Sequence, residues 1–154
     1  SDGVLMEGLN ILPMGEEHIK AIAALERECF STPWSEGTLR AQLGRPSSVF
    51  FAACLDGEVV GYLGMERVLD EGYIDNVAVF PAHRRKGVAS ALLGALIAYG
   101  EKEGMAFLTL EVRPSNQGAR ALYEAHGFQQ VGERKNFYQN PVENALLLTR
   151  YLDE

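Results

Sequence analysis

The stretch YIDNVAVFPAHRRKGVASALL, Tyr73–Leu93, joins a strand pattern to a helix pattern through a short basic turn. Tyr73–Phe80 is rich in strand-forming residues and is closed by Pro81. A helix is predicted from about residue 85 to residue 103, because its apolar side chains recur on one face. They are Val88, Leu92, Ala95, Leu96 and Tyr99. Ala106–Val112 is apolar at nearly every position and is expected to be a buried strand, so the order strand–helix–strand predicts a right-handed crossover between parallel strands.

The segments around this unit predict antiparallel strands, and Asp56-Gly57 is a strong hairpin signal between two of them. Further strands are expected at Gly8–Met14, Val49–Cys54, Glu58–Met65, Phe128–Arg134 and Asn144–Tyr151. Two helices are expected at Glu16–Phe30 and Ser35–Leu43. A third helix is expected to begin at Ser115 as its cap, to carry Ala119, Leu122 and Tyr123 on one face, and to end at His126-Gly127. Residues 1–154 are therefore expected to form one α/β domain, with a mixed, mostly antiparallel sheet, a parallel central strand pair and helices on both faces. Residues 1–8 are expected to be disordered or left over from cloning, since Met6 is the first methionine.

The composition of the chain indicates a globular domain and argues against a membrane protein or a general nucleic-acid binder. A chain of 154 residues with 47% hydrophobic and 23% charged residues is typical of a globular domain with a real core. It contains no run of about 18 apolar residues, which a membrane span needs, and its N-terminus lacks a signal-peptide pattern. A net charge of −7 argues against general nucleic-acid binding. We expect a cytoplasmic monomer that engages neither membrane nor nucleic acid.

Cysteines and histidines predict neither a disulfide framework nor a metal site. Cys29 and Cys54 fall in helix and strand patterns, where small core residues are expected, and their low number suits a reducing compartment. His18, His83 and His126 lack the spacing of metal ligands. No metal is expected.

The basic turn Arg84–Ser90 predicts an anion site inside this acidic chain. Arg84, Arg85 and Lys86 stand directly before Gly87, at the junction between a strand and a helix. A helix N-terminus has free N–H groups and partial positive charge, while Gly87 and Ala89 let a ligand approach the backbone. This combination favours a pyrophosphate site. A solvated basic loop is the alternative.

Arg84-Arg85-Lys86-Gly87-Val88-Ala89 resembles the R/Q-x-x-G-x-G/A signature of the GCN5-related N-acetyltransferases. The segments LTLEVRPSNQGARALYEAHGF, GERKNFYQNPVENALLL and FSTPWS are similar to the RimI-type bacterial branch, which acetylates the N-terminal alanine of a small-subunit ribosomal protein. The likeness runs from about Leu9 to Leu148. It implies a GNAT fold and transfer of acetyl from acetyl-CoA to an amine.

The resemblance implies where acetyl-CoA binds. The strand at Val77, Ala78 and Val79 would splay from its parallel neighbour and offer backbone groups to the pantetheine arm. The pyrophosphate would bind the N–H groups of the turn formed by Arg85, Lys86, Gly87, Val88, Ala89 and Ser90, and Arg84 and Lys86 would add positive charge. Asn116 matches a further cofactor position. A plain core strand is the alternative for Val77–Val79.

Two residues match the family's catalytic groups. Glu111 would be the general base for direct attack by the amine, and Tyr123, with a reference pKa near 10, the general acid for the leaving sulfur. From the residues alone, Glu111 is better explained as a carboxylate that pairs with Arg113 or is exposed at a strand end. Tyr123 is better explained, from the residues alone, as a core aromatic.

The loops Phe30–Ser35 and Asn136–Val142 would form two walls of a peptide groove. Trp34 and Tyr138 are the expected substrate contacts, although packing of its own loop is the alternative for Trp34. The family's paired tyrosines are replaced here by Phe137-Tyr138, so the first hydroxyl is absent. A protein N-terminus, from a small-subunit ribosomal protein, is the expected substrate; a broader N-terminal range, a small-molecule amine, and a non-catalytic acyl-CoA-binding module remain alternatives.

Overall fold

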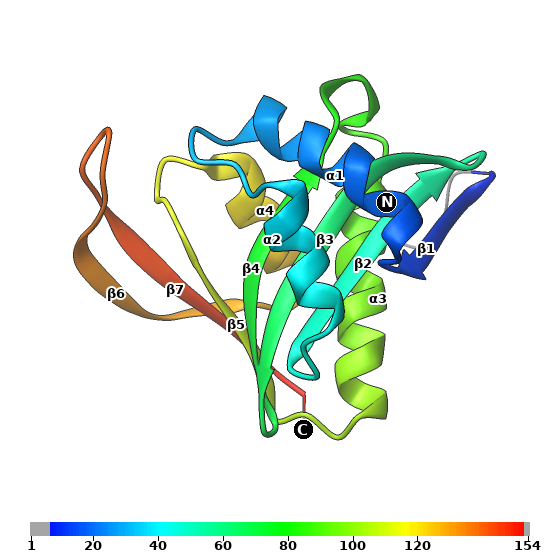
Figure 1. Cartoon of the computed structure of the whole chain (residues 1–154). Helices are drawn as coiled ribbons and strands as arrows, with labels where there is room; N and C mark the ends of the chain where they lie inside the picture. Colours follow the sequence, from blue (N-terminus) through cyan, green and yellow to red (C-terminus); the bar gives the residue numbers. More distant parts are fainter. Residues whose placement is uncertain (1–6, 153–154) are drawn as a thin grey trace.

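The computed structural model describes residues 7–152 and contains seven strands and four α-helices in that range (Figure 1). The strands are β1 (Leu9–Pro13), β2 (Ser48–Leu55), β3 (Glu58–Val68), β4 (Glu71–Val79), β5 (Phe107–Val112), β6 (Gln129–Tyr138) and β7 (Glu143–Tyr151). The helices are α1 (Glu16–Cys29), α2 (Glu36–Leu43), the short 3-10 turn η1 (Pro81–His83), α3 (Val88–Lys102) and α4 (Gln117–Ala125). The expected elements are all present. Of residues 1–8, only Glu7 and Gly8 are described, as a turn, and the expectation for residues 1–6 lies outside the described residues.

All seven strands form one sheet in the order β1-β2-β3-β4-β5-β7-β6. β4 and β5 run parallel, as the crossover predicted, and the other neighbours are antiparallel. The β4–β5 pairing covers only Glu71–Tyr73 on one strand and Phe107–Thr109 on the other. Beyond Tyr73 the two strands separate, so the upper half of β4 keeps β3 as its neighbour and turns its other edge to an open wedge (Figure 1).

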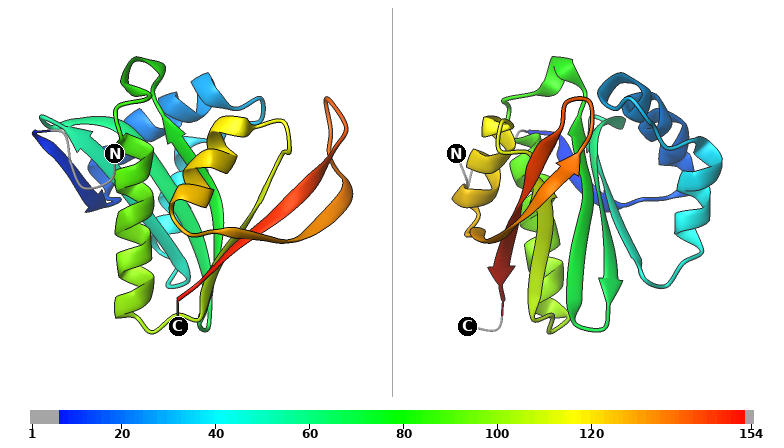
Figure 2. Two further views of the ribbon diagram at one scale, coloured as in Figure 1. Left: turned by 180° about the vertical axis from the view of Figure 1, so that it is seen from behind. Right: turned by 90° about the vertical axis from the view of Figure 1, so that its left-hand side faces the viewer.

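Helices cover both faces of the sheet, with α1 and α2 on one side and α3 and α4 on the other (Figure 2). Each face has its own core, because successive strand residues point to opposite sides. Tyr62 and Ala78 pack with α1, whereas Leu63 and Val79 pack with α3. The expected mixed fold with helices on both faces is confirmed.

Strand β5 corrects the expectation of a strand buried on both faces. Leu108, Leu110 and Val112 are buried on the α3 side, but Glu111 on the opposite face is exposed. The reason is that α1 contacts β3 and β4, and no helix formed by residues 7–152 lies over the α1-side face of β5 (Figure 2). The charged residue in an apolar strand therefore lies where water reaches it.

Strand β4 contains a bulge that the sequence did not predict. Gly64 pairs with Asn76 and Met65 with Ile74, so Asp75 is left without a partner in the register. A bulge shifts the alternation of faces by one residue. Asn76 consequently reaches Tyr62 on the α1 side, while Val77 faces the α3 side.

The start of α4 is a second correction. Asn116, rather than Ser115, is the N-cap, and its side-chain oxygen accepts a hydrogen bond from the N–H of Ala119 at 3.1 Å. The Ser115 hydroxyl instead donates to Glu143 at 2.8 Å. Both residue types can cap a helix, so the backbone path after β5 decides between them.

Candidate active site

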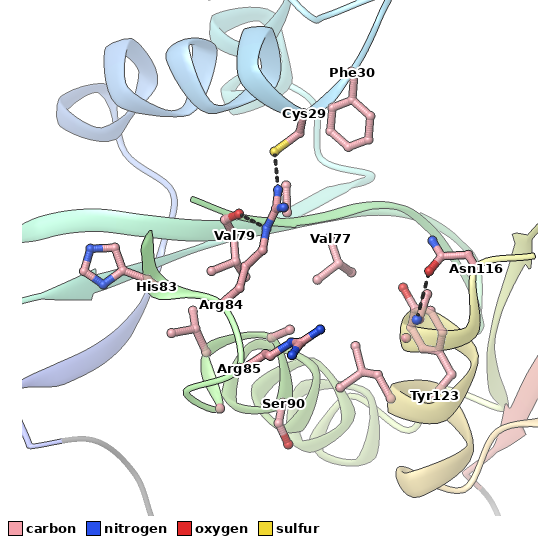
Figure 3. Close-up of a pocket in the computed structure, with 17 residues that line it drawn as sticks. Cys29, Phe30, Val77, Val79, His83, Arg84, Arg85, Ser90, Asn116 and Tyr123 are labelled. Atoms are coloured by element: carbon pink, nitrogen blue, oxygen red, sulfur yellow. Dashed lines mark hydrogen bonds between the residues drawn. The ribbon is translucent and has the colours of Figure 1, made fainter. Parts of the chain in front are cut away.

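The wedge between β4 and β5 opens on the α3 side into a cavity of about 560 Å³. Its walls are the end of α1, the upper half of β4, the basic turn, and the first turns of α3 and α4 (Figure 3). It brings together these expected cofactor and catalytic residues: Val77, Ala78, Val79, Arg84, Arg85, Gly87, Val88, Ala89, Ser90, Asn116 and Tyr123. Lys86, Glu111, Trp34 and Tyr138 are not among its lining residues.

The turn before α3 has the properties of a phosphate cradle. Gly87 is the N-cap of α3 with φ of +85°, a left-handed conformation that favours glycine, and Arg85 is also left-handed with φ of +62°. No side chain caps the first turn of α3, so its N–H groups are free to bind a ligand. A Cβ built on Gly87 would meet no protein atom within 4 Å. Residues and space therefore fit an anionic group such as a pyrophosphate.

Arg84 braces the end of β4 against α1. Its Nε donates to the carbonyl of Val79 at 3.0 Å, and its Nη2 lies 3.3 Å from Sγ of Cys29 (Figure 3). The guanidinium thus lies on the α1 side of the cavity. Arg85, also a lining residue, carries the second positive charge of this wall.

Glu111 lies outside this cavity, in a cleft of about 300 Å³ on the other face of the split strands. Its carboxylate is 35% exposed and lies 3.6 Å from Nε of Arg134 on β6. The alternative of a pair with Arg113 is wrong, because Arg113 pairs with Glu143 at 3.1 Å. An exposed carboxylate with one distant cation can exchange a proton with a group that enters the cleft.

Asp75, in the β4 bulge, lines the same cleft as Glu111. Loss of hydration together with the charges of Glu66 and Glu111 raises the pKa of Asp75 to about 6, although Arg45 opposes the shift. The sequence analysis missed this residue, because a lone aspartate in a strand pattern does not show that a bulge turns it toward a second carboxylate.

Two tyrosine hydroxyls complete the region between the cavity and the cleft. Burial, followed by the neighbouring Tyr138, raises the pKa of Tyr123 to about 12. The ring of Tyr123 packs edge-on against Phe128 at 5.4 Å between centroids. Burial and then the charge of Glu111 raise the pKa of Tyr138. Tyr123 therefore keeps its proton at neutral pH, since burial and Tyr138 both raise its pKa, while the charge of Glu111 acts on Tyr138.

The loop between β6 and β7 is tied to the end of β5. Arg113 donates to the carbonyls of Gln139 and Pro141 at 2.8 and 2.9 Å, and its guanidinium lies 4.5 Å from the centre of the Tyr138 ring. Hydrogen bonds from Ser115 and Arg113 lower the pKa of Glu143 in the same group. One arginine thus holds the expected second wall beside the wedge.

Trp34 packs against the core of its own side of the sheet. Its ring lies 5.9 Å from that of Phe50, which in turn stacks on Tyr62 at 6.2 Å. The cavity is lined instead by Cys29 and Phe30 at the end of α1; Cys29 was expected to be a core residue, and Phe30 was expected only as part of the peptide wall Phe30–Ser35. No local signal identifies them, since only the placement of α1 over β4 brings them to the cavity.

Neither a membrane helix nor a metal cluster is found among residues 7–152. No helix in this range is both long and apolar enough to span a bilayer. No three acidic, histidine or cysteine side chains in it gather so that they could hold a metal ion.

The chain is similar to characterised acetyltransferases over most of its length. The model of the acetyltransferase (GNAT) family matches residues 19–128. The ribosomal protein bS18-alanine N-acetyltransferase of Haemophilus influenzae is 37% identical over 131 residues, 83% of this chain and 88% of that protein. The Escherichia coli K12 enzyme of the same name is 40% identical over 114 residues, 74% of this chain and 76% of that protein. The crystal structure of the ribosomal-protein-S18-alanine N-acetyltransferase from Escherichia coli matches with a TM-score of 0.86 at 32% identity, covering 95% of each chain. The chain therefore belongs to the acetyltransferase (GNAT) family and is an acetyl-CoA-dependent N-acetyltransferase.

Proposed function

We propose that the protein acetylates the N-terminal alanine of a small-subunit ribosomal protein, with residues 1–154 acting as one catalytic domain and as a monomer. The observation that carries the proposal is the pair of openings at the β4–β5 wedge, one beside a phosphate-type turn and one beside the exposed carboxylate of Glu111. Relatives that are 37% and 40% identical carry this activity in their names. Two openings on opposite faces of the sheet would allow acetyl-CoA and the acceptor amine to enter from opposite sides and to meet between β4 and β5.

Acetyl-CoA, which supplies an activated acetyl thioester, would occupy the α3-side cavity. The first-turn N–H groups at Val88, Ala89 and Ser90, with Arg85 and Lys86, would hold its pyrophosphate. The backbone of Val77, Ala78 and Val79 has no β5 partner and would bind the pantetheine amides. Asn116 would add an amide, because its oxygen is used for the helix cap while its NH₂ stays free to donate.

The acceptor amine would enter from the cleft that holds Glu111. An α-amino group has a pKa near 8 and is mostly protonated at neutral pH, so Glu111 would accept its proton directly or through water. The neutral nitrogen would then add to the acetyl carbon and form a tetrahedral oxyanion, and the carbon–sulfur bond would break as this oxyanion collapses to the amide. The second proton that the nitrogen loses would pass through water to Tyr123 and replace the proton that Tyr123 gives to the sulfur. N–H groups of the open β4 edge would stabilise the oxyanion. Tyr123, protonated because its pKa is about 12, would give a proton to the departing sulfur.

The substrate peptide would lie between the loops Phe30–Ser35 and Asn136–Val142. Tyr138 is the proposed contact on the second loop, where Arg113 holds its ring from the β5 side. Trp34 is the proposed contact on the first loop, although its tilted ring contact with Phe50 leaves it partly buried. A broader range of protein N-termini, or a small-molecule amine, is the competing substrate.

The test is mass spectrometry of a peptide mixture incubated with the protein and acetyl-CoA. The mixture contains peptides with free N-terminal Ala, Ser, Met or Gly, and N-blocked peptides that contain lysine. Acetyl gain on free N-termini, strongest on alanine, is expected. Gain only on lysine, or none on any peptide while acetyl-CoA binds normally, would contradict the proposal and favour another amine.

A further inference from the structure

A buried carboxylate beside the active site has no role in the proposed chemistry. Glu26, in the last turns of α1, is 1% exposed. Among residues 7–152, no lysine, arginine or histidine lies within ion-pair distance of it. A carboxylate in such a place costs stability unless several donors replace its hydration.

Three donors from three separate parts of the chain surround this carboxylate. The backbone N–H of Trp34 donates to Oε1 at 2.8 Å. The Tyr62 hydroxyl, on β3, donates to Oε2 and itself accepts from the Asn76 amide at 3.2 Å. The Asn76 amide, on β4, also lies 3.4 Å from Oε2. All three partners donate, which matches a carboxylate that only accepts.

This arrangement connects the substrate side of the wedge to its cofactor side. Trp34 belongs to the loop Phe30–Ser35, whose other end, Phe30, lines the α3-side cavity. Asn76 directly precedes Val77, a lining residue of that cavity, and reaches the α1 side only because the bulge at Asp75 shifts the faces of β4. One side chain therefore joins the loop Phe30–Ser35 to strand β4, and each of the two contributes a residue to the wall of the cavity.

We propose that Glu26 is a positioning residue for acetyl transfer, which fixes the loop Phe30–Ser35 against β4 and so shapes the peptide wall. The claim that this wall binds peptide rests on the proposed function. The claim that Glu26 holds the loop does not. Substitution of a purely structural carboxylate would weaken folding, acetyl-CoA binding and peptide binding alike. Substitution of a residue that positions this loop would weaken peptide binding most.

Glu26→Gln is the decisive variant, because it keeps the size of the side chain and replaces an acceptor by an NH₂ group that faces the Asn76 amide. Glu28→Gln is its matched control, since it makes the same change on the exposed face of the same helix. Tyr62→Phe removes the hydroxyl that donates to Glu26 and accepts from Asn76, leaves Glu26 its two other donors, and gives a milder test if Glu26→Gln folds poorly. The double variant Glu26→Gln/Asn76→Asp exchanges the amide and the carboxylate and restores complementary partners.

The position of the loop is measured without any reaction. Trp34 is the only tryptophan in the chain, so its emission and its quenching by acrylamide report on this loop alone. We expect a red shift and stronger quenching in Glu26→Gln, a smaller effect in Tyr62→Phe, and none in Glu28→Gln. Unchanged Trp34 emission in both Glu26→Gln and Tyr62→Phe would overturn the proposal.

Steady-state kinetics with a peptide that has an N-terminal alanine test whether Glu26 shapes the wall that binds the peptide. Loss of one charge-assisted hydrogen bond is expected to raise the peptide KM about tenfold in Glu26→Gln, with kcat and the acetyl-CoA Kd changed less. The double variant should recover most of the peptide KM. An equal loss for acetyl-CoA and peptide, with no recovery in the double variant, would overturn the positioning role. If the unaltered protein acetylates no peptide, the proposed function fails, while Trp34 emission still decides whether Glu26 holds the loop.

Discussion

Substitution of Gly87 by alanine has two separate expected effects, which are backbone strain in the folded protein and obstruction of the turn that would bind acetyl-CoA. Its φ is +85°, and a methyl group added there meets no protein atom within 4 Å. Gly87→Ala therefore costs only the left-handed conformation, about 1–2 kcal/mol of folding free energy. For a chain of this length, such a loss lowers Tm by about 2–8 °C.

The affinity for acetyl-CoA should fall separately from stability. The space over Gly87 is where the proposed pyrophosphate would approach the first turn of α3. Losing one charge-assisted hydrogen bond there, about 1.5–3 kcal/mol, weakens binding about 10- to 150-fold. Gly87→Glu adds bulk and a negative charge, so it should weaken binding further.

Gly104 offers a matched control at the other end of α3. Its φ is +69°, and a Cβ there also meets no protein atom within 4 Å. Gly104→Ala should therefore lower Tm by a similar amount and leave acetyl-CoA binding unchanged. Thermal denaturation and calorimetric titration with acetyl-CoA measure the two effects. Equal acetyl-CoA affinity in Gly87→Ala and Gly104→Ala would refute the assignment of this turn.

Three further substitutions test the groups around the wedge. Glu111→Gln should lower kcat about 10²-fold in steady-state assays while the acetyl-CoA Kd holds, because Glu111 lies outside the cofactor cavity; an unchanged kcat removes it from the mechanism. Tyr123→Phe keeps the ring contact with Phe128, so kcat should fall about tenfold or more with Tm unchanged, and a matching loss of Tm would argue for a packing role. The pKa of Asp75 is raised from 3.8 to about 6 in the folded state. Between these two pH values the folded state binds more protons than the unfolded state, so the contribution of Asp75 to the free energy of unfolding declines as pH rises through this range. Asp75→Asn should accordingly raise Tm at pH 7 by about 2–4 °C, and the gain should shrink toward pH 4. The gain is modest because much of the Asp75 side chain still reaches water, which screens its charge; a constant difference across this range would contradict the shift.

Local signals account for the parts of the fold that the sequence predicted. Period-2 and helical patterns located the strands and helices, and Pro81 marked the end of β4. Asp56-Gly57 forms the expected hairpin with both residues at positive φ. Gly87 stands in the left-handed conformation before α3 for the same local reason. The strand–helix–strand order predicted the parallel pair, because a helix between two strands returns the chain to the same end of the sheet, so the second strand runs parallel to the first.

Contacts between distant elements decided the rest of the site. The sequence showed Glu111 in an apolar strand, but only the absence of a helix over that face of β5 explains its exposure and its pairing with Arg134. The bulge at Asp75 depends on the register against β3 and turns Asn76 toward Glu26, a residue 50 positions earlier. Such features depend on how two distant surfaces pack against each other, and a short segment of sequence does not contain that information. The sequence by itself therefore determined the elements, their order and the phosphate-type turn, whereas tertiary packing decided which side chains meet across the wedge.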